Sequence, residues 1–322
     1  MTMNSSVRTS SATRWLRRAA LPLLILTALV VTPTLAVAVP PLEHRPSVIV
    51  LPGASSTEGI AKGQGSTFYA GDLFRGDIFS GDVRHGTAET FIDAPDGRMA
   101  LGMAFDHRHD LLFVAGGPGQ AYVYDTRSGA TVASYTFVDD PASSFINDVT
   151  LTAEGAWFTD SLQPLLYFVP VDKRGTPGDF QTLQLSGPAA DTSADFNLNG
   201  IRAADQGRTL IVAHSGNAAL YTVDPESGAS AAIAGISVPN VDGIELSGKT
   251  LWAVQNFSNQ ITRIRLNNDL TSGTVVKVIT SELFQVPTTA ARFGDLLAVV
   301  NAKFDTGLPP TADQYEVVLV GA

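Results

Sequence analysis

The sequence contains no cysteine among its 322 residues, so neither disulfide bonds nor a cysteine-ligated metal site can stabilise the fold. Basic residues are scarce too: 21 Lys and Arg stand against 31 Asp and Glu, and no basic cluster follows Arg18. A nucleic-acid-binding surface needs such a cluster to neutralise phosphates, which argues against this class of partner. Long stretches with the 3.6-residue helical period are also absent, which argues against a helical protein.

The first 38 residues have the three parts of a signal peptide. Four arginines and no acids precede the apolar run Ala19–Val31, and Ala36-Val37-Ala38 is a small-residue cleavage motif. The apolar run is shorter than the roughly 20 residues that usually span a bilayer, so cleavage after Ala38 is favoured over an uncleaved membrane anchor. We expect a secreted protein with no stable membrane span, made of a signal peptide at 1–38, a linker at 39–46 and one domain at 47–322.

The mature chain is strongly acidic. Cleavage removes four arginines and no acids, which leaves 17 basic against 31 acidic residues and a formal charge of −14. Such an excess keeps a secreted protein soluble and is compatible with cation binding. The remaining 284 residues are enough to build a large core, and we expect a monomer.

Short apolar runs separated by Gly, Pro, Asn and Asp fill the chain from Val48 to Val320 and predict an all-β protein. A unit of about 40 to 50 residues recurs in these runs. In its clearest copies the unit begins with a polar residue, then Gly or Asp, then an apolar residue, and a turn and two further strands follow. The six units begin at Glu58, Leu101, Asn147, Asn199, Asp242 and, less clearly, Thr288. This spacing predicts a six-bladed β-propeller with four-stranded blades.

The last unit is one strand short. Its third strand is expected at Tyr315–Val320, while the apolar run Val48–Leu51 precedes the first unit and has no blade of its own. A propeller ring must close, because otherwise its first and last sheets leave open edges. We therefore expect Val48–Leu51 to form the outer strand of the last blade.

The innermost strand of each blade lines the central tunnel, so the first residues of the six units form one ring. Four of the six are oxygen donors: Glu58, Asn147, Asn199 and Asp242. Two carboxylates and two amides suit a hard divalent cation, with calcium favoured over copper or zinc. Asn-Gly and Asp-Gly are also common turn dipeptides, so a purely structural interpretation stays open at this point.

The series Glu58-Gly-Ile, Asn147-Asp-Val, Asn199-Gly-Ile and Asp242-Gly-Ile resembles the calcium-binding ring of the regucalcin and gluconolactonase family. The chain also resembles paraoxonase and diisopropylfluorophosphatase, but more distantly. Two further stretches are typical of the family, namely Ala156-Trp-Phe-Thr-Asp-Ser and the segment from Asn199 to Val223-Asp-Pro. The resemblance covers nearly all of the mature chain.

The resemblance implies calcium-dependent hydrolysis of a lactone or ester. Glu58 and Asn199 match metal ligands, and Asn147 matches a residue that touches the metal or the substrate. Asp242 matches the family carboxylate that acts as base or nucleophile. The metal would polarise the carbonyl and activate a bound water.

One position departs from the family pattern. Sugar-lactone members carry an arginine two residues before the third-blade asparagine, and this chain has Phe145 there. The departure favours a more apolar substrate, with Phe145 as a substrate contact or as an anchor for its loop.

The ends of the second strands are expected on the rim of the pocket. They carry Asp72, Gly116, Asp160, His214, Asn256 and Asn301. His214 is the one histidine among them and is predicted as a proton shuttle, with a solvated rim residue or a donor to a neighbouring loop as the alternatives. Asp160 is a candidate substrate contact, although capping of the turn with Ser161 is the favoured interpretation.

Three functions remain open from the sequence. The first is a calcium-dependent lactonase or esterase, the second a non-catalytic propeller whose ion is structural and whose face binds a partner or ligand, and the third a phosphoester hydrolase on the same scaffold. Neither Gly-x-Ser-x-Gly nor His-Glu-x-x-His occurs, so no serine-hydrolase or zinc-protease motif competes with them.

Overall fold

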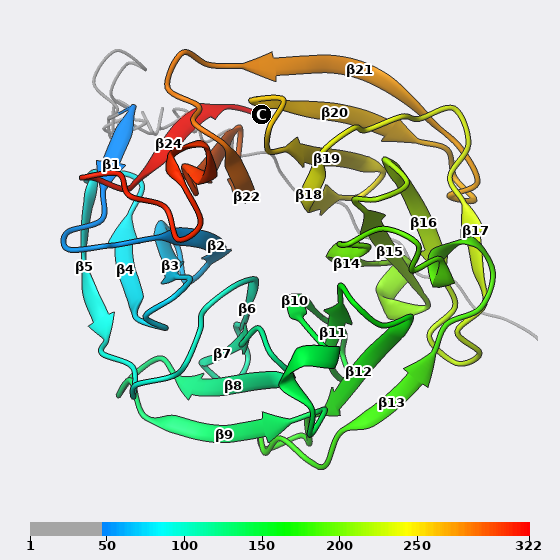
Figure 1. Cartoon of the computed structure of the whole chain (residues 1–322), viewed down its shortest axis with the longest axis horizontal. Helices are drawn as coiled ribbons and strands as arrows, with labels where there is room; N and C mark the ends of the chain where they lie inside the picture. The colour runs from blue at the N-terminus through cyan, green and yellow to red at the C-terminus, as the bar shows by residue number, and fades with distance from the viewer. Residues whose placement is uncertain (1–46) are drawn as a thin grey trace, which may run out of the picture. The chain divides into compact units, whose positions relative to one another are not determined.

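The structure is a computed structural model that describes residues 47–322. The predicted signal peptide and the linker at 39–46 lie outside the described residues. The described chain forms a ring of six blades around a central tunnel (Figure 1). This confirms the predicted all-β six-bladed propeller.

Each blade is an antiparallel sheet of four strands that follow one another outward from the tunnel. Blades 1 and 2 consist of β2 (Thr57–Lys62), β3 (Thr67–Asp72), β4 (Ile78–Asp82) and β5 (Thr87–Ile92), and of β6 (Met103–Asp106), β7 (Leu111–Ala115), β8 (Gln120–Asp125) and β9 (Thr131–Thr136). Blade 3 consists of β10 (Ile146–Leu151), β11 (Gly155–Asp160), β12 (Leu165–Pro170) and β13 (Gln181–Gln184). Blades 4 and 5 consist of β14 (Leu198–Ala204), β15 (Thr209–His214), β16 (Ala219–Val223) and β17 (Ser230–Ala232), and of β18 (Val241–Ser247), β19 (Thr250–Gln255), β20 (Gln260–Leu266) and β21 (Gly273–Thr280).

Blade 6 closes the ring by joining the two ends of the described chain. Its strands are β22 (Pro287–Phe293), β23 (Leu296–Asn301), β24 (Glu316–Gly321) and, outermost, β1 (Val48–Val50). β1 pairs antiparallel with β24, with Val48 opposite Val318, and the Leu51 N–H donates to the Tyr315 carbonyl at 3.0 Å. The predicted closure by the N-terminal strand is confirmed.

The core is divided among the junctions between blades. Six clusters of buried apolar side chains occur in the described chain, and each joins two neighbouring blades. Second strands such as β7 and β23 are almost wholly buried, because neighbouring blades cover both of their faces. Outer strands face solvent, as β21 does. Every blade therefore depends on its neighbours, which fixes the inner strands around the tunnel.

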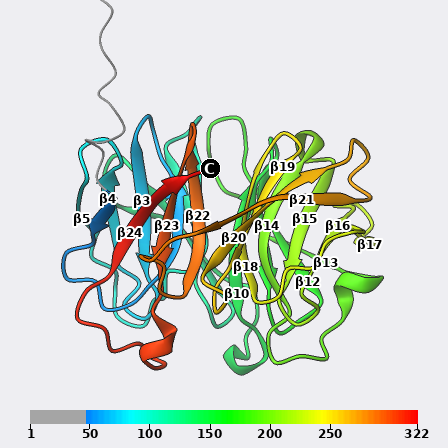
Figure 2. The same cartoon turned by 90° about the horizontal axis from the view of Figure 1, so that it is seen from above.

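Four short 3-10 helices lie in the connections of the described chain, at η2 (Pro141–Ser143), η3 (Pro188–Ala190), η4 (Asp205–Gly207) and η5 (Phe304–Thr306). Figure 2 shows the ring edge-on, with the strands running between two faces and the η5 turn, coloured orange-red, on the lower face. Within residues 47–322 no helix has both the length and the apolar character to cross a membrane.

Candidate functional site

A β-bulge interrupts the innermost strand in five of the six blades. At each bulge two residues intervene between paired positions: Glu58-Gly59, Asn147-Asp148, Asn199-Gly200, Asp242-Gly243 and Thr288-Thr289. A bulge bends its strand and re-aims the side chains at that point. The four predicted ligand positions thus occupy one structural position, repeated in blades 1, 3, 4 and 5.

The glycine after the ligand position is required by close packing at the tunnel. A Cβ atom on Gly59 would lie 1.9 Å from the Leu101 carbonyl oxygen, and one on Gly200 would lie 2.6 Å from the Ile244 nitrogen. The backbones of neighbouring inner strands therefore approach too closely for a side chain here. The Asn-Gly and Asp-Gly dipeptides reflect this approach of adjacent blades.

Glu58, Asn147, Asn199 and Asp242 line one cavity of about 570 Å³ at the tunnel. Each of the four is nearly buried, with 5–7% of its surface exposed. Leu101 of the predicted ring lines the cavity as well. Thr288 does not; it is fully buried, and its hydroxyl donates to the Glu58 carbonyl at 2.6 Å.

Two serines orient the two amides. The Asn147 Nδ2 donates to the Ser161 Oγ at 3.0 Å, and the Asn199 Nδ2 donates to the Ser215 Oγ at 3.2 Å. Each serine hydroxyl in turn donates to a backbone carbonyl of the next blade, at 2.6 Å and 2.7 Å. Because the amide nitrogens are anchored in this way, the Oδ1 atoms are left as acceptors for a ligand of the cavity.

The two carboxylates differ in their partners. The Asp242 Oδ2 accepts from the Asn256 Nδ2 at 2.9 Å, whereas the Glu58 Oε2 is buried and has no hydrogen-bond partner within residues 47–322. Burial raises the pKa of Asp242 to about 7. Burial and the negative charges of Asp242 and Asp148 raise the pKa of Glu58 well above its usual range. In the absence of a cation, the site disfavours two ionised carboxylates.

The donor set fits a hard cation. Carboxylate and amide oxygens are the ligands that calcium prefers, and a cation would satisfy the orphaned Glu58 oxygen and compensate both charges. No three His, Cys, Asp or Glu side chains of the described chain converge on a common point, so such an ion would need the amide oxygens as well. Glu58, Asn147, Asn199 and Asp242 are the residues that could hold it.

Asp160 and His214 lie behind the cavity, which corrects the prediction that they stand on its rim. Neither lines the cavity, and both are fully buried. The Asp160 carboxylate accepts from the Phe145 and Leu162 N–H groups at 2.9 Å and 3.0 Å. The His214 Nε2 donates to the Asp191 carbonyl at 2.8 Å, and its Nδ1 accepts from the Asn217 N–H at 3.1 Å. Both ring nitrogens are occupied, so His214 has no free site for a shuttled proton.

The rim residues were predicted wrongly because the register at the ends of the second strands was taken one residue too early. Side chains alternate along a strand, so a shift of one residue turns a side chain to the other face. Asp72, Asp160 and His214 share a register and point back toward the loop before the inner strand. The next residues, Ser161 and Ser215, are the ones that touch the ligand positions, as Asn256 does in blade 5.

Much of the remaining cavity wall is apolar. Phe145 lines it, with its ring centroid 5.3 Å from that of Phe196 in a T-shaped contact. Four of the lining side chains are strongly exposed: Phe74 at 39%, Phe196 at 45%, Phe257 at 60% and Leu308 at 76%. Further apolar side chains come from six other positions, Leu73, Met99, Leu101, Val241, Phe304 and Pro309. The cavity joins a polar set of four oxygen donors to an apolar wall and mouth.

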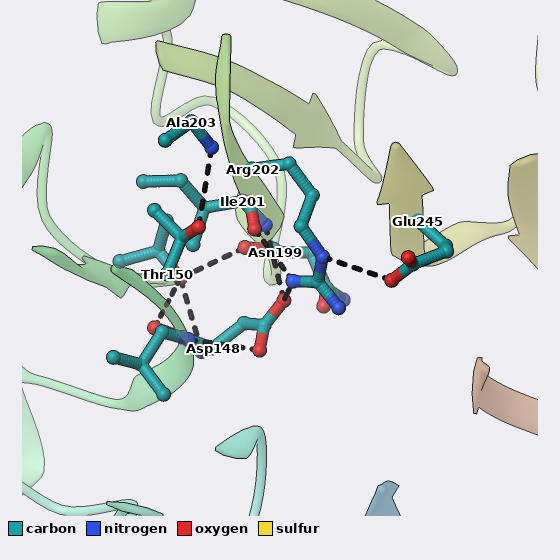
Figure 3. A network of polar contacts seen from close by, with 9 residues as sticks. Asp148, Thr150, Asn199, Ile201, Arg202, Ala203 and Glu245 are labelled. Carbon is teal, nitrogen blue, oxygen red and sulfur yellow. Dashed lines mark hydrogen bonds and ion pairs between the residues drawn. The ribbon is translucent and has the colours of Figure 1, made fainter. Parts of the chain in front are cut away.

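Sequence reasoning missed a charged network behind the site, which Figure 3 shows. Asp148 stands where blades 1, 4 and 5 carry glycine, and its Oδ2 accepts from the Arg202 Nη1 at 3.2 Å. The Arg202 Nε donates to Glu245 at 3.3 Å. Burial raises the pKa of Asp148, although Arg202 opposes this shift. The signal that the sequence offered for this network was Asp148 itself, an aspartate at a position of the repeat where three other blades carry glycine.

Comparison with known proteins supports the fold. No family model matches the chain, and no curated protein matches it in sequence. Among solved structures, it is similar to the major allergen Mala s 1 of Malassezia sympodialis, with a TM-score of 0.64 and 15% identity over 85% of this chain and 96% of that one. A protein from Lactobacillus plantarum has a TM-score of 0.54 and 15% identity, over 82% of this chain and 88% of that one. At such identities the likeness shows the propeller fold alone.

Proposed function

We propose that this protein is a secreted, metal-dependent hydrolase of lactones or esters, with calcium held by Glu58, Asn147, Asn199 and Asp242. The observation that carries the proposal is the buried Glu58 Oε2, which lacks a partner in the described chain and faces a second buried carboxylate. A cation between the two carboxylates would satisfy the unpartnered oxygen of Glu58 and offset the repulsion between the two negative charges. The resemblance to the regucalcin and gluconolactonase family, carried by the same four positions, supports this assignment.

The roles of the residues follow from their contacts. A bound calcium would supply a Lewis acid for the carbonyl and lower the pKa of water. Asn147 and Asn199 present fixed amide oxygens, because their nitrogens are held by serines. Asp242 is the proposed proton acceptor, because it lines the cavity beside the other three donors and matches the family carboxylate that acts as base or nucleophile. Asn256 holds this carboxylate in place.

The apolar wall supports an apolar substrate. Phe145 and Phe196 stand where a sugar would need polar partners. A hydroxylated lactone would lose hydrogen bonds to water on entering, whereas an aryl or alkyl group would bury apolar surface. We therefore expect hydrophobic lactones or aryl esters to be turned over better than sugar lactones.

The test is hydrolysis of a mixed panel of lactones and aryl esters by the mature protein, stripped with chelator and then given calcium. We expect activity to be lost on stripping and restored by calcium. Asp242→Asn should abolish activity in a protein that stays folded, whereas Glu89→Gln, on the exposed outer strand β5, should leave it unchanged. Unchanged turnover in Asp242→Asn would refute its catalytic role.

The same experiment separates the alternatives. If calcium raises the melting temperature but no lactone or ester is hydrolysed, the ion is structural and the cavity binds a ligand or partner. Turnover of phosphoesters alone would instead assign the third function considered from the sequence. Export is tested separately, because cleavage after Ala38 predicts that the secreted protein begins at Val39.

A further inference from the structure

A second cavity, of about 140 Å³, lies in the tunnel toward the other face of the ring. The bulged positions of the predicted ligands stand near the start of the inner strands, whereas this cavity is lined by residues two to four positions further along them. Since these strands run between the two faces (Figure 2), the two cavities occupy opposite ends of the tunnel. We call this second one the rear cavity. Its charged lining residues are Lys62, Arg202, Glu245 and Arg292.

The acids at the rear cavity are already engaged by one arginine. The Arg202 guanidinium lies between Asp148 and Glu245 and is 15% exposed (Figure 3). Its Nε and Nη1 are used, whereas its Nη2 makes no hydrogen bond to another residue of 47–322. Arg202 thus cancels much of the negative charge and still has a donor to offer.

Neither of the other two cations forms an ion pair in the described chain, although the positive charge of Arg292, like that of Arg202, opposes the rise that burial causes in the pKa of Glu245. The Arg292 Nη1 donates to the Ser247 Oγ at 3.0 Å, and its guanidinium carbon lies 5.3 Å from the Trp252 ring centroid. Its Nε is buried without a hydrogen-bond partner within residues 47–322. The Lys62 Nζ lies 5.5 Å from the Phe293 ring centroid and forms no ion pair or hydrogen bond there. Three cations with unused donors therefore face one small cavity in an acidic protein.

We propose that the rear cavity binds a small oxyanion, held by Lys62, Arg292 and the free Nη2 of Arg202. Guanidinium and ammonium groups with unused N–H donors are the groups that bind phosphate and carboxylate oxygens best. The tunnel would then hold a cation in the larger cavity at one end and an anion in the rear cavity at the other end. Arg202 separates the two. The proposal does not depend on hydrolase activity.

The test is binding of inorganic phosphate to calcium-free mature protein, measured by calorimetry and by melting temperature at constant ionic strength, with chloride as the reference anion. We expect phosphate to stabilise the protein more than chloride does. Arg292→Met should weaken phosphate binding about tenfold or more, since a hydrogen bond to a charged group contributes roughly 1.5–3 kcal/mol. Lys62→Met, at an exposed position, should weaken it in a fully folded protein.

Lys249→Met is the matched control. Lys249 is a surface cation paired with Asp205 at 2.9 Å and does not line the rear cavity, so its loss should leave phosphate binding unchanged. Arg292→Lys keeps the positive charge and should retain part of the affinity. Equal stabilisation by phosphate and chloride, or equal phosphate affinity in Lys62→Met, Lys249→Met and the unmodified protein, would overturn the proposal.

Discussion

Replacing Glu58 with glutamine tests the cation site while nearly preserving the shape of the side chain. In the calcium-free protein Glu58 is a buried carboxyl group with an unpartnered oxygen, next to a second raised-pKa acid. Leaving such a group unsatisfied costs about 1–3 kcal/mol, and more when it is charged. With the charge removed, we expect Glu58→Gln to stabilise the chelator-treated protein at pH 8 by about 2 kcal/mol, or roughly 4 °C in melting temperature.

Added calcium should stabilise the unmodified protein more than it stabilises Glu58→Gln. At a concentration 100 times its Kd, calcium stabilises a protein by about 2.7 kcal/mol. Glu58→Gln removes one of the two formal charges of the site, so we expect calcium affinity to fall at least about tenfold. At the same calcium concentration the gain then falls to about 1.4 kcal/mol. The variant is therefore more stable without calcium and gains less from it.

Differential scanning calorimetry with and without calcium measures both effects. Glu89→Gln removes a carboxylate from the exposed strand β5 and serves as the control, which should match the unmodified protein in both conditions. An equal gain from calcium in Glu58→Gln and in the unmodified protein would show that Glu58 is no ligand. A lower melting temperature of the chelated variant would show that its carboxylate is satisfied in a way the structure does not contain.

Three further predictions concern pH, the amide anchors and the apolar wall. Because the pKa of Asp242 rises from 3.8 to about 7 on folding, the calcium-free protein should lose stability as pH rises from about 4 to 7, and melting curves with chelator should show a steeper fall than curves with calcium. Ser215→Ala frees the Asn199 amide and should weaken calcium binding by about 1 kcal/mol, or roughly fivefold, by calorimetry; an unchanged Kd would argue against an ordered amide ligand. Phe145→Ala removes the contact with Phe196 and should raise KM for aryl esters roughly two- to tenfold, whereas KM for a sugar lactone should not rise; equal changes for both would count against an aromatic contact.

The repeat made the fold predictable from the sequence. Each blade carries the same order of strands, so the weak signal of one short strand is supported by five others. The predicted closure by Val48–Leu51 followed from counting strands, because an incomplete last blade needs a partner for β24. The four predicted ligand residues line one cavity for the same reason, since equal places in the repeat become equal places around the tunnel.

Second-strand contacts could not be predicted in the same way. The choice between His214 and Ser215 depends on a shift of one residue, and the bulge in β14 changes the pairing register just before this point. A pattern of apolar residues does not reveal a bulge, so sequence reasoning assigned His214 to the wrong face. The pairing of Arg202 with Asp148 and Glu245 was also hidden, because it joins three blades whose residues are far apart in the chain.

The asymmetry of the ring bears on whether the proposed ion would be catalytic or structural. Blades 1, 3, 4 and 5 carry oxygen donors at the ligand position, whereas blade 2 carries Leu101 and blade 6 carries Thr288, whose hydroxyl is used by the Glu58 carbonyl. A structural ion is enclosed by protein ligands, and a catalytic ion keeps a position for water or substrate. Here the four donors face a cavity of about 570 Å³ whose mouth carries exposed Phe257 and Leu308. The space above the donors therefore favours an ion that a substrate can reach, and Asp242 lines that same space.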